Sequence, residues 1–484
     1  MKHSESSTQF MRTSLSSWQA FWSPSDLPSQ MNSFALLRLS ILIYNTLGYM
    51  EDNFVLSDFS FHLYEAKNTR ENKLSDSDVV LTLISSTVGI GFLLLPIAFA
   101  FCGWGLSILV SLAVMVLQAN ANYSLVRVAS KLKLTSYPLV VERLIGRKWL
   151  INVFNALLFS MNLATTIVYM ITIVYVFLNT MIGFSKSNIA LIREIGFVFD
   201  DVSPELLAVF LNIFLFLFVA FKNKFLMFSK LALGSFCALL FAMACVSTLS
   251  VIQRNPKLAE VEMSFSKPEG IPYTLHIFVF SFMNSPSVVE LYNEREKKNV
   301  RKFKRLLYYA FGLIFAIFTA MSMFVYYGSG DLLIGYQRSN ILLAPYFNNF
   351  FGEIAKLFVV GFLFVNAALR LIPIKEMMLR WIGLENRTSH VFHILTMSVL
   401  ILLTTLATVA VLVLEITLRN LVCGLVLLIA PMIGYHFPFF AFISTFSGFK
   451  SETRRTYLSI ALMFTGIFVH ALIIFESILQ LLIR

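Results

Sequence analysis

The chain has 484 residues, of which 57% are hydrophobic and only 13% are charged. A soluble domain usually carries about a quarter charged residues because its surface must be solvated, so this composition excludes an ordinary soluble protein. The net charge of +11 does not indicate nucleic-acid binding, because the Lys and Arg residues cluster in short loops between apolar stretches of bilayer-spanning length. We therefore expect an all-α polytopic membrane protein.

The N-terminal part of the chain differs from the rest. Residues 1–33 are Ser-rich and polar and lack the pattern of a cleavable signal peptide. An apolar run at residues 34–50 contains Arg38 and is barely long enough to cross a bilayer, so we favour an interfacial helix over an additional span. Residues 1–75 are thus predicted to form a polar, cytosolic tail, and residues 76–484 the transmembrane domain.

About eleven apolar spans follow the tail. Residues 79–126 contain no charged residue and no histidine, which indicates two spans joined by a tight turn at residues 102–105. The other nine are predicted within residues 149–183, 206–221, 225–252, 271–292, 306–327, 354–374, 393–414, 420–445 and 457–482. Their lengths suit a hydrocarbon core of about 30 Å.

Basic residues concentrate in alternate loops. Most of them lie at residues 131–148, 222–230, 294–305, 375–387 and 450–455. The positive-inside rule therefore predicts a cytosolic N-terminus and a C-terminus on the far side of the membrane. The sequon at Asn386 falls in a predicted cytosolic loop, so a glycan on Asn386 would overturn this topology.

Two of the spans contain residues that interrupt helices. The first span has Gly89 and Gly91 shortly before Pro96, and the sixth has Pro286 directly after Ser285. A helix breaks inside a bilayer only where other groups satisfy its backbone. If spans one to five and six to ten are two repeats, the breaks occupy matching positions, which indicates a transporter's central site.

A broken helix presents both ends of its backbone dipole. The free N–H groups at the start of a half-helix suit a carboxylate, and unwound carbonyls suit a cation or an ammonium group. An α-amino acid carries both charges, so such a site fits a zwitterion. The alternatives are close helix packing for the glycines and a simple kink for the proline.

Several segments, in order along the chain, resemble the amino acid/auxin permease family. They are residues 89–99 closed by Gly103, and residues 137–146, 280–294, 327–342 and 373–375. The likeness covers residues 76–480 and implies about eleven spans in a LeuT-like 5+5 inverted repeat, with helices one and six broken. It implies neutral or cationic amino acids as cargo, coupled to a proton or a sodium ion or moved by exchange, with no other cofactor and no metal.

The resemblance also implies a substrate site on spans one, three and six. Its residues would be Ser86, Thr87, Val88, Gly89, Ile90, Gly91, Tyr169, Phe280, Ser281, Phe282, Met283 and Asn284. The backbone of the first span would bind the substrate carboxylate, and the sixth span would form the facing wall. Tyr169 would face the cavity, or alternatively pack between helices.

Five residues are candidates for ion coupling. They are Ser85, Asn366, Arg370, His276 and Glu290. Ser85 and Asn366 depart from the residues common in sodium-coupled members, which puts sodium coupling in doubt. Arg370 would replace a bound cation or grip an acidic group, because a charge inside a span is costly; the alternative is that it extends to the interface. His276 and Glu290 flank the break in span six and are candidates for proton transfer.

Secondary active transport by alternating access is the leading hypothesis. An amino-acid sensor without net transport is the main alternative, and a polytopic membrane enzyme is less favoured because no nucleophile, base or metal-ligand cluster stands out. The expected partners are an amino acid and the lipid bilayer, and no nucleic acid. The expected location is the plasma membrane or a vacuolar or lysosomal membrane, and the oligomeric state stays open.

Overall fold

A computed structural model describes residues 74–185, 194, 202–220, 225–252, 270–296, 298–330, 333, 342, 349–381, 390–414, 422–426 and 429–483. These residues lie in one compact unit, Lys73–Arg484. Their secondary structure is helical apart from one parallel bridge between Leu74 and Arg295, which confirms the expected all-α class. The apolar run at residues 34–50 and the sequon at Asn386 lie outside the described residues.

The first span consists of two half-helices, α4 (Asp76–Thr87) and α5 (Gly91–Cys102), which are bent by 59° relative to each other. Residues 88–90 form the break between them. The Ser75 side chain caps α4, and Gly103, with a φ of 75°, forms the expected tight turn after α5. The predicted break in span one is therefore present.

Four more helices complete the first five spans. They are α6 (Trp104–Leu132), α8 (Lys148–Ser185), α10 (Pro204–Ala220) and α11 (Phe225–Ile252), with the short α7 (Tyr137–Ile145) between α6 and α8.

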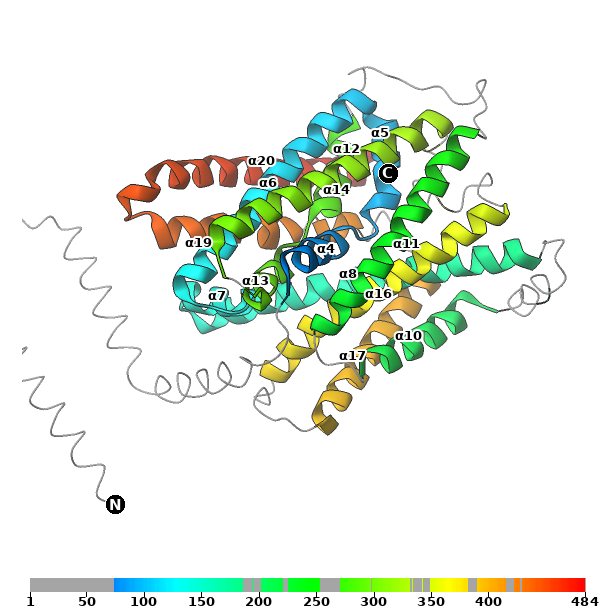
Figure 1. Cartoon of the computed structure of the whole chain (residues 1–484), viewed down its shortest axis with the longest axis horizontal. Coiled ribbons are helices and arrows are strands. Elements are labelled where there is room, and N and C mark those ends of the chain that lie inside the picture. The colour runs from blue at the N-terminus through cyan, green and yellow to red at the C-terminus, as the bar shows by residue number, and fades with distance from the viewer. Residues whose placement is uncertain are drawn as a thin grey trace, which may run out of the picture. The chain divides into compact units, whose positions relative to one another are not determined.

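The sixth span is broken in the same way, into α12 (Gly270–Phe282) and α13 (Ser285–Glu294), with Met283 and Asn284 between them. The remaining elements are α14 (Val300–Ser329), α16 (Phe350–Trp381), α17 (His390–Val413), the π-helix η3 (Met432–His436), α19 (Phe437–Phe446), the 3₁₀ turn η4 (Lys450–Glu452) and α20 (Thr453–Ile483) (Figure 1).

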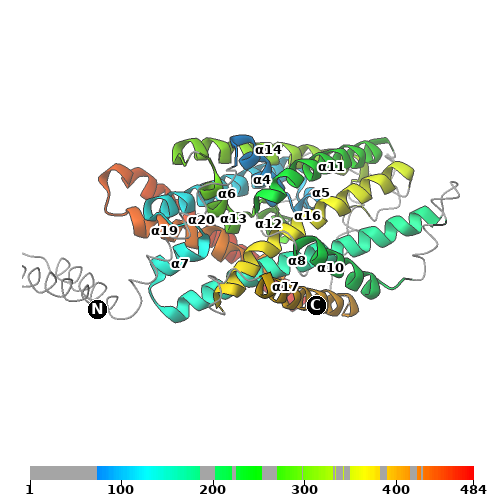
Figure 2. The ribbon, with the colours of Figure 1, turned by 60° about the horizontal axis from the view of Figure 1, so that its bottom comes forward.

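Corresponding helices of the two sets of five pack against each other. Helix α5 packs on α12, α8 on α16, and α10 on α17. Helices α8 and α16 run side by side in both views (Figures 1 and 2), and α4 contacts α13. Each half-helix of a broken span thus meets a half-helix of the other, as expected for a 5+5 repeat.

Seven described helices are long and apolar enough to cross a membrane, or eight spans if α4 and α5 count as one. The other three expected spans correspond to α10, the α12–α13 pair and the η3–α19 segment. Helix α10 and the η3–α19 segment are shorter apolar helices. The described residues thus contain seven to eight full-length spans, and the three further segments lie where the remaining expected spans were placed.

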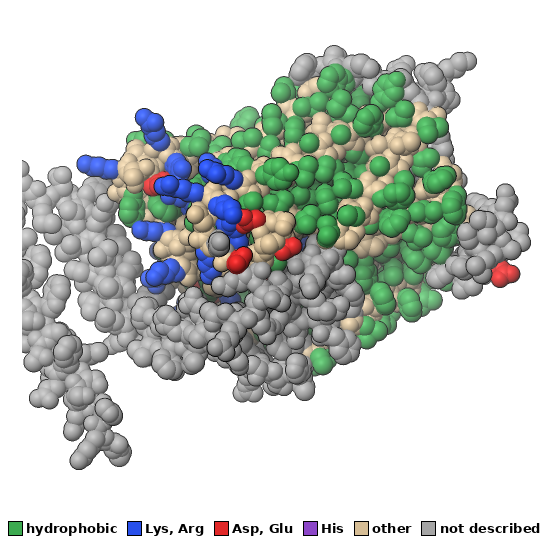
Figure 3. Space-filling model, in the orientation of Figure 1, with side chains coloured by type: hydrophobic (Ala, Val, Ile, Leu, Met, Phe, Trp, Pro, Cys, Tyr) green, Lys and Arg blue, Asp and Glu red, His purple; other side chains and the backbone are tan. Residues whose placement is uncertain are grey.

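The outer surface of the helices is apolar. Phe210 on α10, Leu406 on α17 and Phe464 on α20 are all more than half exposed, whereas the polar Gln118 and Asn122 of α6 are buried. Apolar side chains cover most of the face in Figure 3, and Lys and Arg gather at one end. This distribution suits a surface in contact with lipid.

Three helical segments differ from the expected spans and loops. Helix α16 continues past its expected end, through Pro373 to Trp381. The segment at residues 294–305, expected to be a charged loop, is helical from Val300 onward because the Asn299 side chain caps α14. The tenth span is not a continuous α-helix, since it contains the π-helix η3.

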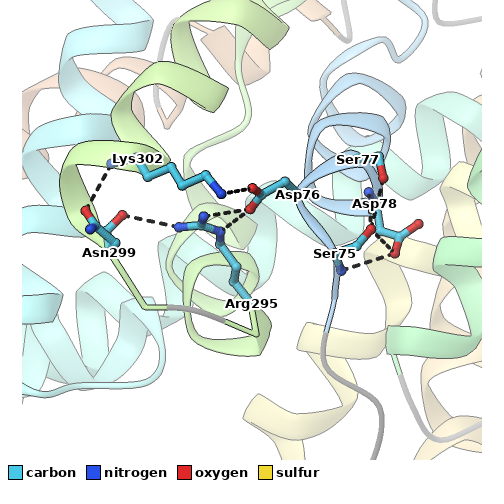
Figure 4. Close-up of polar contacts among 7 residues, drawn as sticks. All are labelled: Ser75, Asp76, Ser77, Asp78, Arg295, Asn299 and Lys302. Atoms are coloured by element: carbon cyan, nitrogen blue, oxygen red, sulfur yellow. Dashed lines mark hydrogen bonds and ion pairs between the residues drawn. The ribbon is translucent and has the colours of Figure 1, made fainter.

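A buried arginine fastens the start of α4 to the loop after α13 (Figure 4). Arg295 is fully buried and donates from Nε to Asp76 Oδ1 at 2.7 Å, and Lys302 pairs with the other carboxylate oxygen. The Leu74 N–H also donates to the Glu294 carbonyl at 3.0 Å. The first half-helix is therefore held at this end by both charge and backbone.

We expect Asp76→Asn to destabilise the protein by about 3 kcal/mol, because it leaves the Arg295 guanidinium buried without its counter-charge. The matched control is Lys302→Gln, which removes an exposed partner of the same carboxylate and should cost less than about 1 kcal/mol. Thermal unfolding of both purified variants in detergent makes the comparison. Equal melting temperatures for Asp76→Asn and the unchanged protein would contradict this role.

Candidate substrate site

The two breaks lie against each other. In the break of the sixth span, Asn284 donates from Nδ2 to Ser86 Oγ at 2.9 Å, and Ser86 belongs to the last turn of α4. The Asn284 Oδ1 accepts from the Ser287 hydroxyl of α13 at 2.8 Å. One buried amide therefore joins the end of α4 to the start of α13.

The glycines of the first break allow close approach. A Cβ on Gly91 would lie 2.6 Å from the Ser281 Cα of α12, and a Cβ on Gly89 would lie 3.0 Å from the Tyr169 Cζ of α8 and collide with its hydroxyl. A side chain at Gly91 would therefore require the α12 backbone to move, and one at Gly89 would require the Tyr169 ring to move. Close packing, the alternative explanation for these glycines, is thus present at the same place as the break.

The hydroxyl groups near the breaks bond to their own helices. Ser86 donates to the Thr82 carbonyl at 2.7 Å, Thr87 to the Leu83 carbonyl at 2.7 Å, and Ser281 to the Ile277 carbonyl at 2.7 Å. Backbone bonds at the breaks satisfy part of these helix ends, since the Gly89 N–H donates to the Thr87 carbonyl at 2.8 Å and the Met283 N–H donates to the Phe280 carbonyl at 3.3 Å. A ligand at the breaks would therefore meet mainly backbone groups and helix dipole ends.

All twelve residues assigned to the substrate site are buried, so the structure places them in the protein interior. They come from α4, α5 and the break between them, from α8, and from α12 and its break. The Tyr169 ring fills the space beside Gly89, so it faces the break of the first span and also packs between helices.

Arg370 of α16 is directed to the first break. Its Nη2 donates to the Ser86 carbonyl at 2.9 Å, and the same guanidinium interacts with the Tyr169 hydroxyl. The negative end of the α4 dipole lies at this carbonyl. A fixed positive charge therefore occupies the C-terminal end of the first half-helix, rather than extending along α16 to the interface.

The other coupling candidates are dispersed around the breaks. Asn366, one turn before Arg370, donates to the Phe362 carbonyl of its own helix at 3.0 Å. Ser85 is fully buried on α4, His276 is fully buried on α12, and Glu290 is half-buried on α13. His276 and Glu290 thus lie on either side of the sixth-span break, as expected.

One group of residues beside the sixth-span break was not predicted from the sequence. A Cβ on Gly434, in the π-helix η3, would lie 3.3 Å from Gln118 Oε1 of α6 and 3.8 Å from the Met283 Cε. These three residues come from three different spans. Gln118, a buried amide within an otherwise apolar stretch, was the available signal, and π-turns often accompany functional sites.

A charged pair inside span eight was also missed. Lys356 and Glu353 of α16 are both buried, with Lys356 Nζ 3.0 Å from Glu353 Oε1. The same Nζ donates to Asn179 Oδ1 of α8 at 2.6 Å. The signal was the presence of both charges at the start of an apolar span.

Two histidines from different spans form a pair. His436 Nε2 of η3 lies 3.2 Å from His470 Nδ1 of α20, and their rings stack.

Comparison with known proteins identifies the family of the chain. The model of the family described as transmembrane amino acid transporter protein matches residues 72–483. The comparison with curated proteins gave no match. Among solved structures, the chain resembles the crystal structure of MhsT in complex with L-phenylalanine, with a TM-score of 0.56 and 13% identity, over 84% of this chain and 100% of that one. At this identity the likeness shows the fold alone, and it confirms the LeuT-like architecture. Since the family match spans nearly the whole chain, the protein is an integral, multi-pass membrane protein that belongs to the transmembrane amino acid transporter family.

Proposed function

We propose that the protein binds one α-amino acid between the two broken spans and carries it across the membrane by alternating access. The observation that carries this proposal is the contact of the two breaks, in which Asn284 bonds to Ser86 and Gly91 packs on Ser281. Four half-helix ends meet there in the protein interior. That arrangement suits a small molecule with one positive and one negative charge.

The two charges of the substrate would have separate partners. Its carboxylate would bind N–H groups at the start of α5, which begins at Gly91, because the positive dipole end lies there. Its ammonium group would bind the unwound carbonyls at the end of α12. The hydroxyls of Thr87 and Ser281 already bond to their own helices, which supports recognition by backbone.

The side chain of the substrate is proposed to be neutral. The twelve site residues include no Asp or Glu, whereas a cationic side chain would need a carboxylate to offset the cost of its burial. Phe280, Phe282 and Met283 supply an apolar wall. The L-phenylalanine named for MhsT is compatible with such a wall.

We further propose that Arg370 acts as a resident cation in place of a bound sodium ion. Its guanidinium lies at the Ser86 carbonyl, at the dipole end where a metal cation would otherwise be stabilised. Transport would then depend on a proton or on exchange, with His276 and Glu290 as candidates for proton transfer. The N-terminus is proposed to be cytosolic, in the plasma membrane or a vacuolar or lysosomal membrane.

We expect the purified protein in liposomes to accumulate labelled neutral amino acids without a sodium gradient. An imposed proton gradient or preloaded amino acid should stimulate uptake. Liposomes without protein are the control. Binding of an amino acid without flux under every gradient would favour a sensor and refute transport.

We expect Gly89→Ala to weaken substrate affinity about tenfold or more, because the added methyl group displaces Tyr169 and overpacking costs about 1–3 kcal/mol. The matched control is Gly361→Ala on α16, where an added Cβ meets nothing within 4 Å. Uptake kinetics of the two variants at equal protein amount would test this. Equal affinities in both variants would remove Gly89 from the site.

We expect Arg370→Gln to reduce sodium-independent uptake about tenfold or more, because a charged hydrogen bond at the first break is lost. Sodium should partly restore uptake, because the freed Ser86 carbonyl can accept the ion. Arg380→Gln, which removes a charge three turns further along α16, is the matched control. Unchanged uptake and unchanged ion dependence in Arg370→Gln would exclude the resident-cation role.

A further inference from the structure

Lys and Arg residues line a groove at the end of the protein where Figure 3 shows basic side chains gathered. The walls come from the last turns of α6, the first turns of α14, the end of α19 and the η4–α20 corner. Its volume of about 1500 Å³ exceeds the roughly 300–1,000 Å³ of typical small-molecule pockets. Its eight basic residues are Arg127, Lys131, Arg301, Lys304, Arg305, Lys450, Arg454 and Arg455, and its one acidic residue is Glu452.

The Glu452 carboxylate forms ion pairs that connect two walls of the groove. Arg127 of α6 forms a two-pronged pair with Glu452 of η4, at 2.6 and 2.7 Å. Arg455 lies 3.6 Å from the same carboxylate. The Arg127 guanidinium also stacks 4.9 Å from the Phe446 ring. This part of the groove is therefore ordered before any ligand binds.

Aromatic rings support two of the outer cations. Lys131 Nζ lies 5.0 Å from the Phe449 ring, and Lys304 Nζ lies 5.2 Å from the Tyr123 ring and 5.4 Å from the Tyr308 ring. A cation held over a ring keeps its N–H groups available to an anion. Tyrosines at the ends of spans are also typical of the membrane interface.

The groove carries more positive charge than its own carboxylate can neutralise. Within the described residues, the salt bridges of the groove involve only Arg127 and Arg455, both with Glu452. The other six cations repel one another when the groove is empty. A ligand with several phosphates would relieve this repulsion, because each phosphate supplies up to two negative charges and three strong acceptors, which Arg binds in two-pronged fashion.

The position of the groove favours a lipid as the source of the phosphates. It opens where α6, α14 and α20 begin or end, which is the level of the headgroups for helices that span the bilayer. We propose that this groove binds the multiply phosphorylated headgroup of an anionic membrane lipid. Basic pockets between transmembrane helices are suited to such headgroups.

The bound lipid would act on the first half-helix through α14. Arg301, Lys304 and Arg305 line the groove, while Lys302 of the same turns pairs with Asp76 at the start of α4. A headgroup that steadies this end of α14 would therefore also steady the ion pairs that hold α4. The proposed lipid site therefore lies on the same turns of α14 as the ion pair with Asp76.

The test is direct binding of short-chain phosphatidylinositol bisphosphate to the purified full-length protein in detergent. We expect saturable binding that weakens as salt is raised, at least tenfold weaker in the triple variant Arg301→Gln/Lys304→Gln/Arg305→Gln. The charge-matched control is Arg143→Gln/Arg147→Gln/Lys148→Gln, which removes three exposed cations around the end of α7 and should bind within twofold of the unchanged protein. The readout is binding, so it does not depend on whether the protein transports.

Two further arms separate the alternatives. Soluble inositol trisphosphate should bind more weakly than the lipid; equal or tighter binding would make the ligand a free phosphate compound and overturn the lipid assignment. Equal losses of lipid affinity in both triple variants would show general charge attraction and refute the groove as the binding site. If the α14 triple variant does not fold, Lys450→Gln/Arg454→Gln, at exposed positions on the opposite wall, must show the loss instead. Absence of lipid binding by the unchanged protein refutes the proposal.

Discussion

The structure depends on one constraint, which is that backbone groups inside a bilayer must be satisfied within the protein. The first and sixth spans are each interrupted, and either break alone would leave backbone groups without hydrogen-bond partners. They are tolerated because the breaks meet. Asn284 bridges them by bonding Ser86, Gly91 lets α5 approach α12, and the Arg370 guanidinium satisfies the Ser86 carbonyl. The same groups that stabilise the breaks leave half-helix ends facing a common point, which is the proposed substrate site.

Charge is distributed according to the same constraint. Inside the helical bundle a charge appears with a partner, as Lys356 does with Glu353, or at a dipole end, as Arg370 does at α4. At the positive end of the protein, charges need no partner within the chain, because water and lipid headgroups can solvate them there. Arg295 secures α4 through Asp76, while neighbouring cations of α14 line the groove. The turns that begin α14 therefore connect the surface charge to the half-helix that ends at the candidate site.

Much of the fold and part of the candidate site could be predicted from the sequence. Helix-breaking residues have local effects, so Gly89, Gly91 and Pro286 correctly indicated both breaks. Apolar length located the spans, although Pro373 did not end α16 and the tenth span contains a π-helix. Single-residue chemistry identified Arg370 as exceptional. Contacts between distant segments were not accessible, which is why the Lys356–Asn179 bond, the His436–His470 pair and the approach of Gly434 to Gln118 were missed.

The amino-acid sequence by itself determined that this chain crosses a membrane many times and that its first and sixth spans are interrupted, because hydropathy and helix breaking act over a few neighbouring residues. Only the tertiary structure decided what those interruptions face. Arg370 could extend to the interface or reach back to Ser86, and Tyr169 could fill the space beside Gly89 or lie elsewhere. Packing between helices about eighty to nearly three hundred residues apart decides both. Such contacts follow from the complete arrangement of the helices, which no local pattern encodes.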